Sequence, residues 1–230
     1  MTGDADVALG SQTMTEEEWL DSTDPSPMLE FLRGKASDTR FRLFACACVR
    51  RQVWHLLDTR GREAVNVSDR LAQGQASLTE LNTARAAMNT AFHTTHEKAA
   101  KAATKATSMT LWATADAIRI ARHIRDALGQ PDRNTARRDQ VALTRDIFGN
   151  PFHPISLDPT WLTSTVVRLA QAIYEERELP SGHLDQGRLG ILADALEEVG
   201  CTQREILEHC RSEGPHVRGC WVIDLLLGKE

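Results

Sequence analysis

The chain has 230 residues and a formal net charge of −5, with 41% hydrophobic and 26% charged residues. A chain of this length and composition can bury a sizeable core without disulfides or metals. Its N-terminus lacks the pattern of a secretory signal, and no apolar run approaches the roughly 18 residues of a membrane span, so we expect neither secretion nor membrane insertion.

Residues 1–14 are mostly small and polar, which predicts a disordered leader. The folded part should begin at Thr15, because Thr15 and Glu18 have the spacing of a capping box at the start of a helix. This short helix should end near Pro25, which restricts the residue before it. A second short helix follows, and Gly34 is suited to its C-terminal end. We therefore expect a single domain over residues 15–230.

The most hydrophobic segment follows Ser37, a predicted N-cap. From Phe41 to Leu57 the apolar residues recur at steps of three and four, which predicts a helix buried on a broad face. This helix is the first candidate for the core. Another helix is expected from about Arg60 to Gln73.

A long alanine- and threonine-rich region without Pro or Gly runs from Leu78 to about Leu128. Small side chains allow helices to approach closely, so we expect a long helix or a helical hairpin, with a break near Thr107 and Ser108. A further helix should span Asp132 to about Phe148. The expected fold class is all-α, a multi-helix bundle with this alanine-rich element in its middle.

Residues 149–159 (GNPFHPISLDP) contain three prolines, which exclude a helix. This loop separates two possible sub-units, residues 15–148 and 160–230. Its polar residues Asn150, His153 and Asp158 lie on a rigid turn, where functional groups are common. In the alternative interpretation, Asn150 and Asp158 bind nearby backbone and the loop only orders two helices.

Helical periodicity resumes after Thr163 and predicts final helices at residues 188–199, 202–211 and 217–227. We expect the last of these to close the core against the helix at 41–57. The same tail holds four possible metal ligands: Cys201, Cys210, His216 and Cys220. Thiolates and imidazole suit a tetrahedral zinc site. The tail lacks the CxxC spacing of common zinc sites, so packing of small buried cysteines is the alternative.

Basic residues are in excess over residues 98–145, and acidic residues over 175–213. The basic stretch 119–145 could follow a phosphate backbone, with the candidate contacts Arg122, Arg125, Arg133 and Arg137. It has almost no aromatic residues on which bases could stack. The simpler alternative is that the basic middle of the chain packs against its acidic end.

Four sequence blocks resemble a family of alanine-rich helical hypothetical proteins from planctomycete-type bacteria. They are residues 15–57 (including RLFACACVRR), 62–74, 145–163 (RDIFGNPFHPISLDPTWLT), and 191–210 with 214–230 (GPHVRGCWVIDLLLGKE). The region between the second and third blocks differs, because the family often repeats Trp there and this chain has only Trp112. The resemblance implies a self-contained helical unit, without an activity, cofactor or catalytic residue to carry over.

The leading functional hypothesis is a non-catalytic helical interaction or scaffolding module that binds a protein partner and needs no metal or other cofactor. A nucleic-acid-binding regulatory protein and a structural zinc protein are the alternatives. An enzyme that combines the 149–159 loop with a His or Cys of the tail ranks behind them. Five cysteines without paired spacing, in a chain without a signal, predict free thiols in the cytoplasm.

Overall fold

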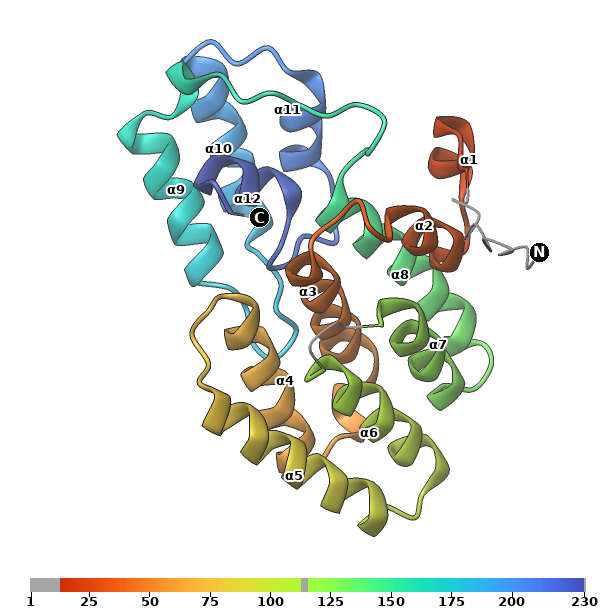
Figure 1. The fold of residues 1–230 in the computed structure, drawn as a ribbon. Coiled ribbons are helices and arrows are strands. Elements are labelled where there is room, and N and C mark those ends of the chain that lie inside the picture. The colour runs from red at the N-terminus through yellow and green to blue at the C-terminus, as the bar shows by residue number, and fades with distance from the viewer. Residues whose placement is uncertain (1–12, 113–115, 230) are drawn as a thin grey trace, which may run out of the picture.

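The computed structural model describes residues 13–112 and 116–229, and within them the regular elements are helices apart from one isolated bridge between His183 and Val217. The predicted all-α class is confirmed. In Figure 1, α3 lies near the centre, with α4–α8 on one side and α9–α12 on the other. The described helices include none with the length and apolarity that a bilayer span requires. The α-helices are α1 (Glu16–Asp21), α2 (Pro25–Leu32), α3 (Asp38–Cys48), α4 (Thr59–Ala72), α5 (Leu78–Thr94), α6 (Lys98–Thr110), α7 (Ala117–Ala127), α8 (Asp132–Phe148), α9 (Ser164–Glu175), α10 (Gln186–Glu198), α11 (Arg204–Arg211) and α12 (Trp221–Leu227).

The predicted helix over residues 41–57 changes geometry partway. After α3 come a π-helix (Val49–Val53) and a 3₁₀ turn (Trp54–Leu56). A π-helix places an extra residue in the turn and so redirects the side chains that follow it. Within the π-helix, Arg51 Nε donates to Asp139 Oδ1 (3.0 Å), and Gln52 donates to the carbonyl of Ala136 (3.1 Å). Both polar side chains thereby reach α8.

The alanine-rich region forms three helices, α5, α6 and α7, rather than one helix broken near Thr107. The Thr107 hydroxyl donates to the Ala103 carbonyl (2.9 Å), so threonine is accommodated within α6 at the expected break. The chain leaves the helix at Thr95 and again after Thr110, three residues beyond the expected break, and Glu97 caps α6 by accepting from the N–H of Ala99 (3.0 Å) and Ala100. The region from 113 to 115 lies outside the described residues.

The core is divided between the two parts of the chain. One large hydrophobic cluster contains Phe44 of α3 with residues of α2, α6, α7 and α8, and another contains Ile223 of α12 with residues of α9–α11. A smaller cluster joins α4 to α5. The prediction that α3 and the tail helix form the core is met in part: Val217 lies in the same cluster as α3, whereas the apolar residues of α12 lie in the other cluster.

The last helix begins at Trp221, four residues later than predicted. Gly219 has a φ of +94°, a left-handed conformation that interrupts helix formation and that a side chain would strain. Val217 lies in the bridge to His183, and its N–H donates to Asp146 Oδ2 (3.0 Å). As a result His216 and Cys220 lie in an irregular segment ahead of α12, where they can face α8.

Candidate metal centre

Four side chains from distant parts of the sequence converge where α8 meets the C-terminal helices. Asp146 comes from the last turn of α8, and His209 from α11. His216 precedes α12, and Cys220 is its N-cap. One ligand atom from each residue lies within 4.8 Å of the others. A carboxylate oxygen, two imidazole nitrogens and a sulfur form a complete donor set for a four-coordinate transition metal.

Three of the six distances among these atoms are close to those of a tetrahedral site. Asp146 Oδ1 is 3.2 Å from His209 Nε2 and 3.1 Å from His216 Nδ1. His209 Nε2 is also 3.2 Å from Cys220 Sγ. Zinc–ligand bonds of 2.0–2.3 Å place tetrahedral donors about 3.3–3.6 Å apart. These three contacts are slightly shorter than that, and the remaining pairs lie within 4.8 Å, so modest side-chain movements would admit an ion.

Both ring nitrogens of His216 have close partners, and the partner of Nδ1 is the Asp146 carboxylate. Its Nε2 is 3.1 Å from the carbonyl oxygen of Ser212 and 3.2 Å from the Ser212 hydroxyl. The hydroxyl donates its own proton to the His209 carbonyl (2.8 Å), so both Ser212 oxygens accept from His216 and Nε2 carries the proton. In the neutral ring Nδ1 is then an acceptor, yet it faces another acceptor, Asp146 Oδ1. Two acceptors at this distance require a proton or a metal ion between them. A backbone carbonyl that fixes the ring in this way is typical of metal-binding histidines.

Burial makes the charges of this cluster costly without a cation. Asp146, His216 and Cys220 are buried, and His209 is half-buried. Burial acts to raise the pKa of Asp146, but hydrogen bonds to His209 and His216 outweigh it and hold that pKa below its usual range. Burial, reinforced by the charge of Asp146, raises the pKa of the Cys220 thiol well above normal. A bound cation would reverse this last effect, because it favours the thiolate.

The same residues do not form a Cys-His-Asp catalytic triad. In a triad one ring nitrogen contacts the nucleophile and the other contacts the carboxylate. Here His209 Nε2 faces both Cys220 Sγ and Asp146 Oδ1, at 3.2 Å each. A nucleophilic cysteine also needs a lowered pKa, whereas burial raises that of Cys220. One nitrogen that faces both groups is also compatible with ligands placed around a single ion.

Two of the four predicted metal ligands belong to this cluster and two do not. His216 and Cys220 contribute to it, whereas Cys201 and Cys210 pack in the C-terminal hydrophobic cluster. Neighbours on a helix point about 100° apart, so His209 can face α8 while Cys210 faces the core. The sequence showed His209 beside Cys210 but gave no signal for Asp146, which lies far upstream on another helix.

The polar residues of the loop at 149–159 contact other groups. Asn150 Nδ2 donates to Glu16 Oε1 (2.8 Å), and His153 Nε2 is 3.0 Å from Glu16 Oε2. Asp158 caps a 3₁₀ turn (Pro159–Trp161) by accepting from the N–H of Thr160 (2.9 Å). The loop therefore ties α1 to the end of α8, and its polar groups lie outside the metal-ligand cluster.

The four arginines predicted to contact nucleic acid do not form one surface. Arg125 is buried and donates to Gln140 Oε1 (2.6 Å), so it cannot reach a ligand, contrary to the prediction. Arg125 follows Ile124 on α7, and the side chains of both residues are buried. Arg133 pairs with Asp126 (3.0 Å), and Arg137 lies 3.8 Å from Asp24. Of the four, Arg122 is exposed on α7.

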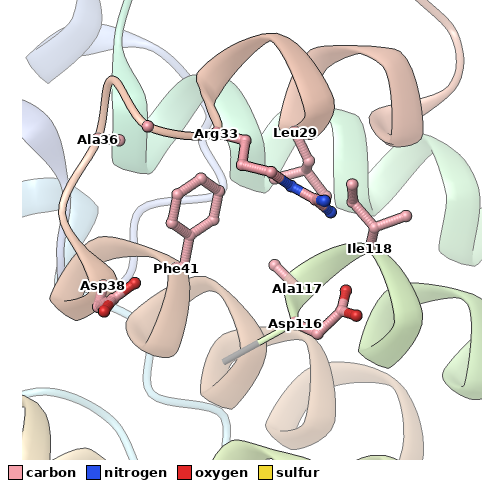
Figure 2. A pocket seen from close by; sticks show the side chains of 9 residues that line it. Leu29, Arg33, Ala36, Asp38, Phe41, Asp116, Ala117 and Ile118 are labelled. Atoms are coloured by element: carbon pink, nitrogen blue, oxygen red, sulfur yellow. The ribbon is translucent and has the colours of Figure 1, made fainter. Parts of the chain in front are cut away.

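A cavity of about 400 Å³ lies between α2, the start of α3 and the start of α7. Figure 2 shows the Phe41 ring at its side and the Arg33 side chain extending between Leu29 and Ile118. Its charged lining residues have structural roles, since Arg33 pairs with Glu30 (3.2 Å) and Asp116 caps α7. None of the site residues predicted from the sequence lines it.

Comparison of the chain with protein-family models, with curated proteins and with solved structures gives no match. The arrangement of the site itself therefore carries the functional interpretation.

Proposed function

We propose that this chain is a helical zinc-binding protein whose metal ion has a structural role. Asp146, His209, His216 and Cys220 would be the ligands. The observation that carries the proposal is the convergence of Asp146 Oδ1, His209 Nε2, His216 Nδ1 and Cys220 Sγ on one buried point. Four protein ligands fill a tetrahedral coordination sphere, which is characteristic of structural rather than catalytic zinc.

The position of the cluster explains what such an ion would hold together. Asp146 lies on α8, and its neighbour Ile147 belongs to the N-terminal hydrophobic cluster. The other three ligands come from α11 and the segment that leads into α12. A metal ion bound to all four would fix the C-terminal helices against α8.

This proposal replaces the metal-free interaction module that the sequence favours. The sequence argument against a metal site was the missing CxxC spacing, and here ligands from distant segments supply the donors instead. We also propose a cytoplasmic location, because none of the five cysteines forms a disulfide and a reducing compartment keeps them reduced. A protein partner remains part of the proposal, with the metal maintaining the shape that the partner would recognise.

Elemental analysis of the purified protein tests the metal proposal. The expected result is about one zinc ion per chain, as a single tetrahedral site requires. His209→Gln and Cys220→Ser should each lose most of the zinc while circular dichroism still reports a helical chain. With cobalt in place of zinc, the wild type should show a thiolate-to-metal charge-transfer band that Cys220→Ser lacks.

The matched controls are Cys201→Ala and Cys210→Ala, which remove thiols of the same tail that lie outside the cluster. Both should keep the zinc and the cobalt band. If Cys201→Ala or Cys210→Ala loses the zinc while His209→Gln retains it, the proposed ligand set is wrong. A wild-type protein that takes up neither zinc nor cobalt would refute the function.

A further inference from the structure

A second site lies at the opposite end of the bundle from the metal cluster, where α5, α6 and the start of α7 meet. It is a cavity of about 390 Å³, within the size range of pockets for small ligands. Its lining combines cationic and aromatic side chains: Arg85, Phe92, Lys105, Trp112 and Arg119, with Met88, Asn89, Ser108 and Met109 between them. The metal proposal assigns these residues no role.

The charge in this cavity is positive and only partly compensated. Arg85, Lys105 and Arg119 line it, and no acidic residue is among its described lining. Arg85 Nη2 donates to the carbonyl of Leu111 (2.9 Å), a neutral partner that orients the guanidinium without cancelling its charge. Arg119 lies 3.9 Å from Asp116, at the outer limit of an ion pair. A ligand of this cavity should therefore be an anion.

Aromatic surface lies beside these cations. Trp112 is 47% exposed, which is unusual for so large an apolar side chain, and Phe92 is half-buried. The backbone of Trp112 is held in place, because Arg42 Nη2 donates to its carbonyl (2.6 Å). The side chain therefore extends from an anchored position at the rim. An exposed indole beside fixed positive charge suits a flat ring that carries a phosphate.

The cations also act together on a neighbouring group. Burial lowers the pKa of His123 on α7, and the charges of Lys105, Arg119 and Arg122 lower it further against the opposing charge of Asp126. Several basic side chains from α6 and α7 thus create a common positive field on this side of the bundle. Such a field would attract phosphate before any direct contact forms.

We propose that this cavity binds a nucleotide unit, with the base stacked on Trp112 and the phosphate held by Lys105 and Arg119. Proteins that bind single-stranded nucleic acid combine these two elements, aromatic faces for the bases and cations for the backbone. A free nucleotide offers the same chemistry. A duplex does not, because its bases are already stacked, and an acidic peptide generally lacks the flat ring beside its charge.

Fluorescence anisotropy of the full-length protein with a labelled oligothymidylate tests this proposal. Trp112→Ala should weaken binding about 5- to 150-fold, the range for loss of one base–aromatic stack. Trp112→Phe keeps an aromatic face and should retain most of the affinity. Lys105→Glu with Arg119→Glu should weaken binding and reduce its salt dependence, because fewer counterions are released. Arg168→Glu, on exposed α9 surface in the other part of the chain, is the charge control for each single reversal, Lys105→Glu or Arg119→Glu, and should bind like the wild type.

Competition by an unlabelled nucleoside monophosphate identifies the source of the nucleotide unit. If the monophosphate displaces the labelled strand as well as unlabelled oligothymidylate does at the same concentration of nucleotide units, the ligand is a free nucleotide. If only the unlabelled strand displaces it, the ligand is single-stranded nucleic acid. Three results would overturn the proposal: no binding of either ligand, equal binding of a duplex with no effect of Trp112→Ala, or equal weakening by Arg168→Glu. The metal ligands are intact in every variant, so failure here leaves the zinc proposal standing.

Discussion

At the scale of single residues, Asp69 is the most densely paired buried charge that the structure describes. Arg50 of the π-helix lies 3.4 Å from Asp69 Oδ2, and Arg218, just before α12, lies 3.7 Å from it. Arg177, after α9, contacts the same oxygen. One carboxylate of α4 therefore balances three guanidinium groups, two of which belong to the C-terminal part of the chain.

Replacement of Asp69 by Asn should strongly destabilise the protein. It leaves the buried Arg50 and the partly buried Arg177 and Arg218 without their counter-charge, and removal of one partner from a buried ion pair typically costs about 3–5 kcal/mol. Urea unfolding followed by circular dichroism measures this change. Asp194→Asn is the control, since Asp194 pairs with Arg211 (2.7 Å) on the exposed surface. That change should cost no more than about 1 kcal/mol. Equal losses of unfolding free energy in the two variants would show that the ion pairs of Asp69 stabilise the protein no more than a surface ion pair does.

At the scale of elements, the start of α5 depends on a capping box. Ser77 accepts from the N–H of Glu80 (3.2 Å), and Glu80 in turn accepts from the N–H of Ser77 (2.8 Å). The hydrogen bonds from the backbone and hydroxyl of Ser77, with a further one from Arg70, lower the pKa of Glu80 to about 2. Because the ordinary value is 4.5, the ionised carboxylate is favoured in the folded helix.

This lowered pKa predicts a specific loss of order in acid. A carboxyl whose folded pKa is depressed stabilises the fold above its unfolded pKa, and this stabilisation is lost as the pH falls from about 4.5 to about 2. Carbon NMR should therefore show Glu80 titrating near pH 2, with faster exchange of the Leu81 amide in the same range. Ser77→Ala should return the titration of Glu80 toward 4.5. Thr15→Ala, which removes the equivalent cap of α1, should leave it unchanged.

The helix caps and the residues of the metal-ligand cluster differ in how well the sequence predicts them. Thr15, Ser37 and Thr163 cap helices as expected, because a cap depends on residues only two or three positions away. In the alanine-rich region the expected break near Thr107 lies three residues from the end of α6, whereas the break after Thr94 was not predicted, since a threonine can either bond within a helix or end it. For the metal cluster, His216 and Cys220 were identifiable from their residue types. Asp146 was not, because its position beside them is set by packing between separate helices.

At the scale of the whole molecule, its surface charges pair mostly within their own regions. Arg211 pairs with Glu197 (2.6 Å) and Arg188 with Glu176 (2.6 Å), both inside the acidic end of the chain. These ion pairs therefore do not join the basic middle of the chain to its acidic end, as the sequence had suggested. The described charged contacts between the two parts centre instead on Asp69 and Asp146. Both are buried carboxylates that receive partners from the C-terminal segment.

Removal of the proposed metal should therefore loosen one side of the molecule selectively. A chelator should lower the unfolding temperature, because an ion that binds only the folded state stabilises it by about 2.7 kcal/mol when its free concentration is 100 times its Kd. Hydrogen exchange should accelerate in α11 and residues 212–220, which carry three of the ligands, and stay unchanged in α4 and α5.

The control for this experiment is His209→Gln, which should already exchange rapidly in these segments and should respond to neither zinc nor chelator. Zinc should restore slow exchange in the wild type after the chelator is removed. Uniform acceleration across all helices would mean that the ion supports the whole fold rather than the junction with α8. Identical exchange with and without metal would mean that Asp146 and His216 hold the tail through their hydrogen bond alone.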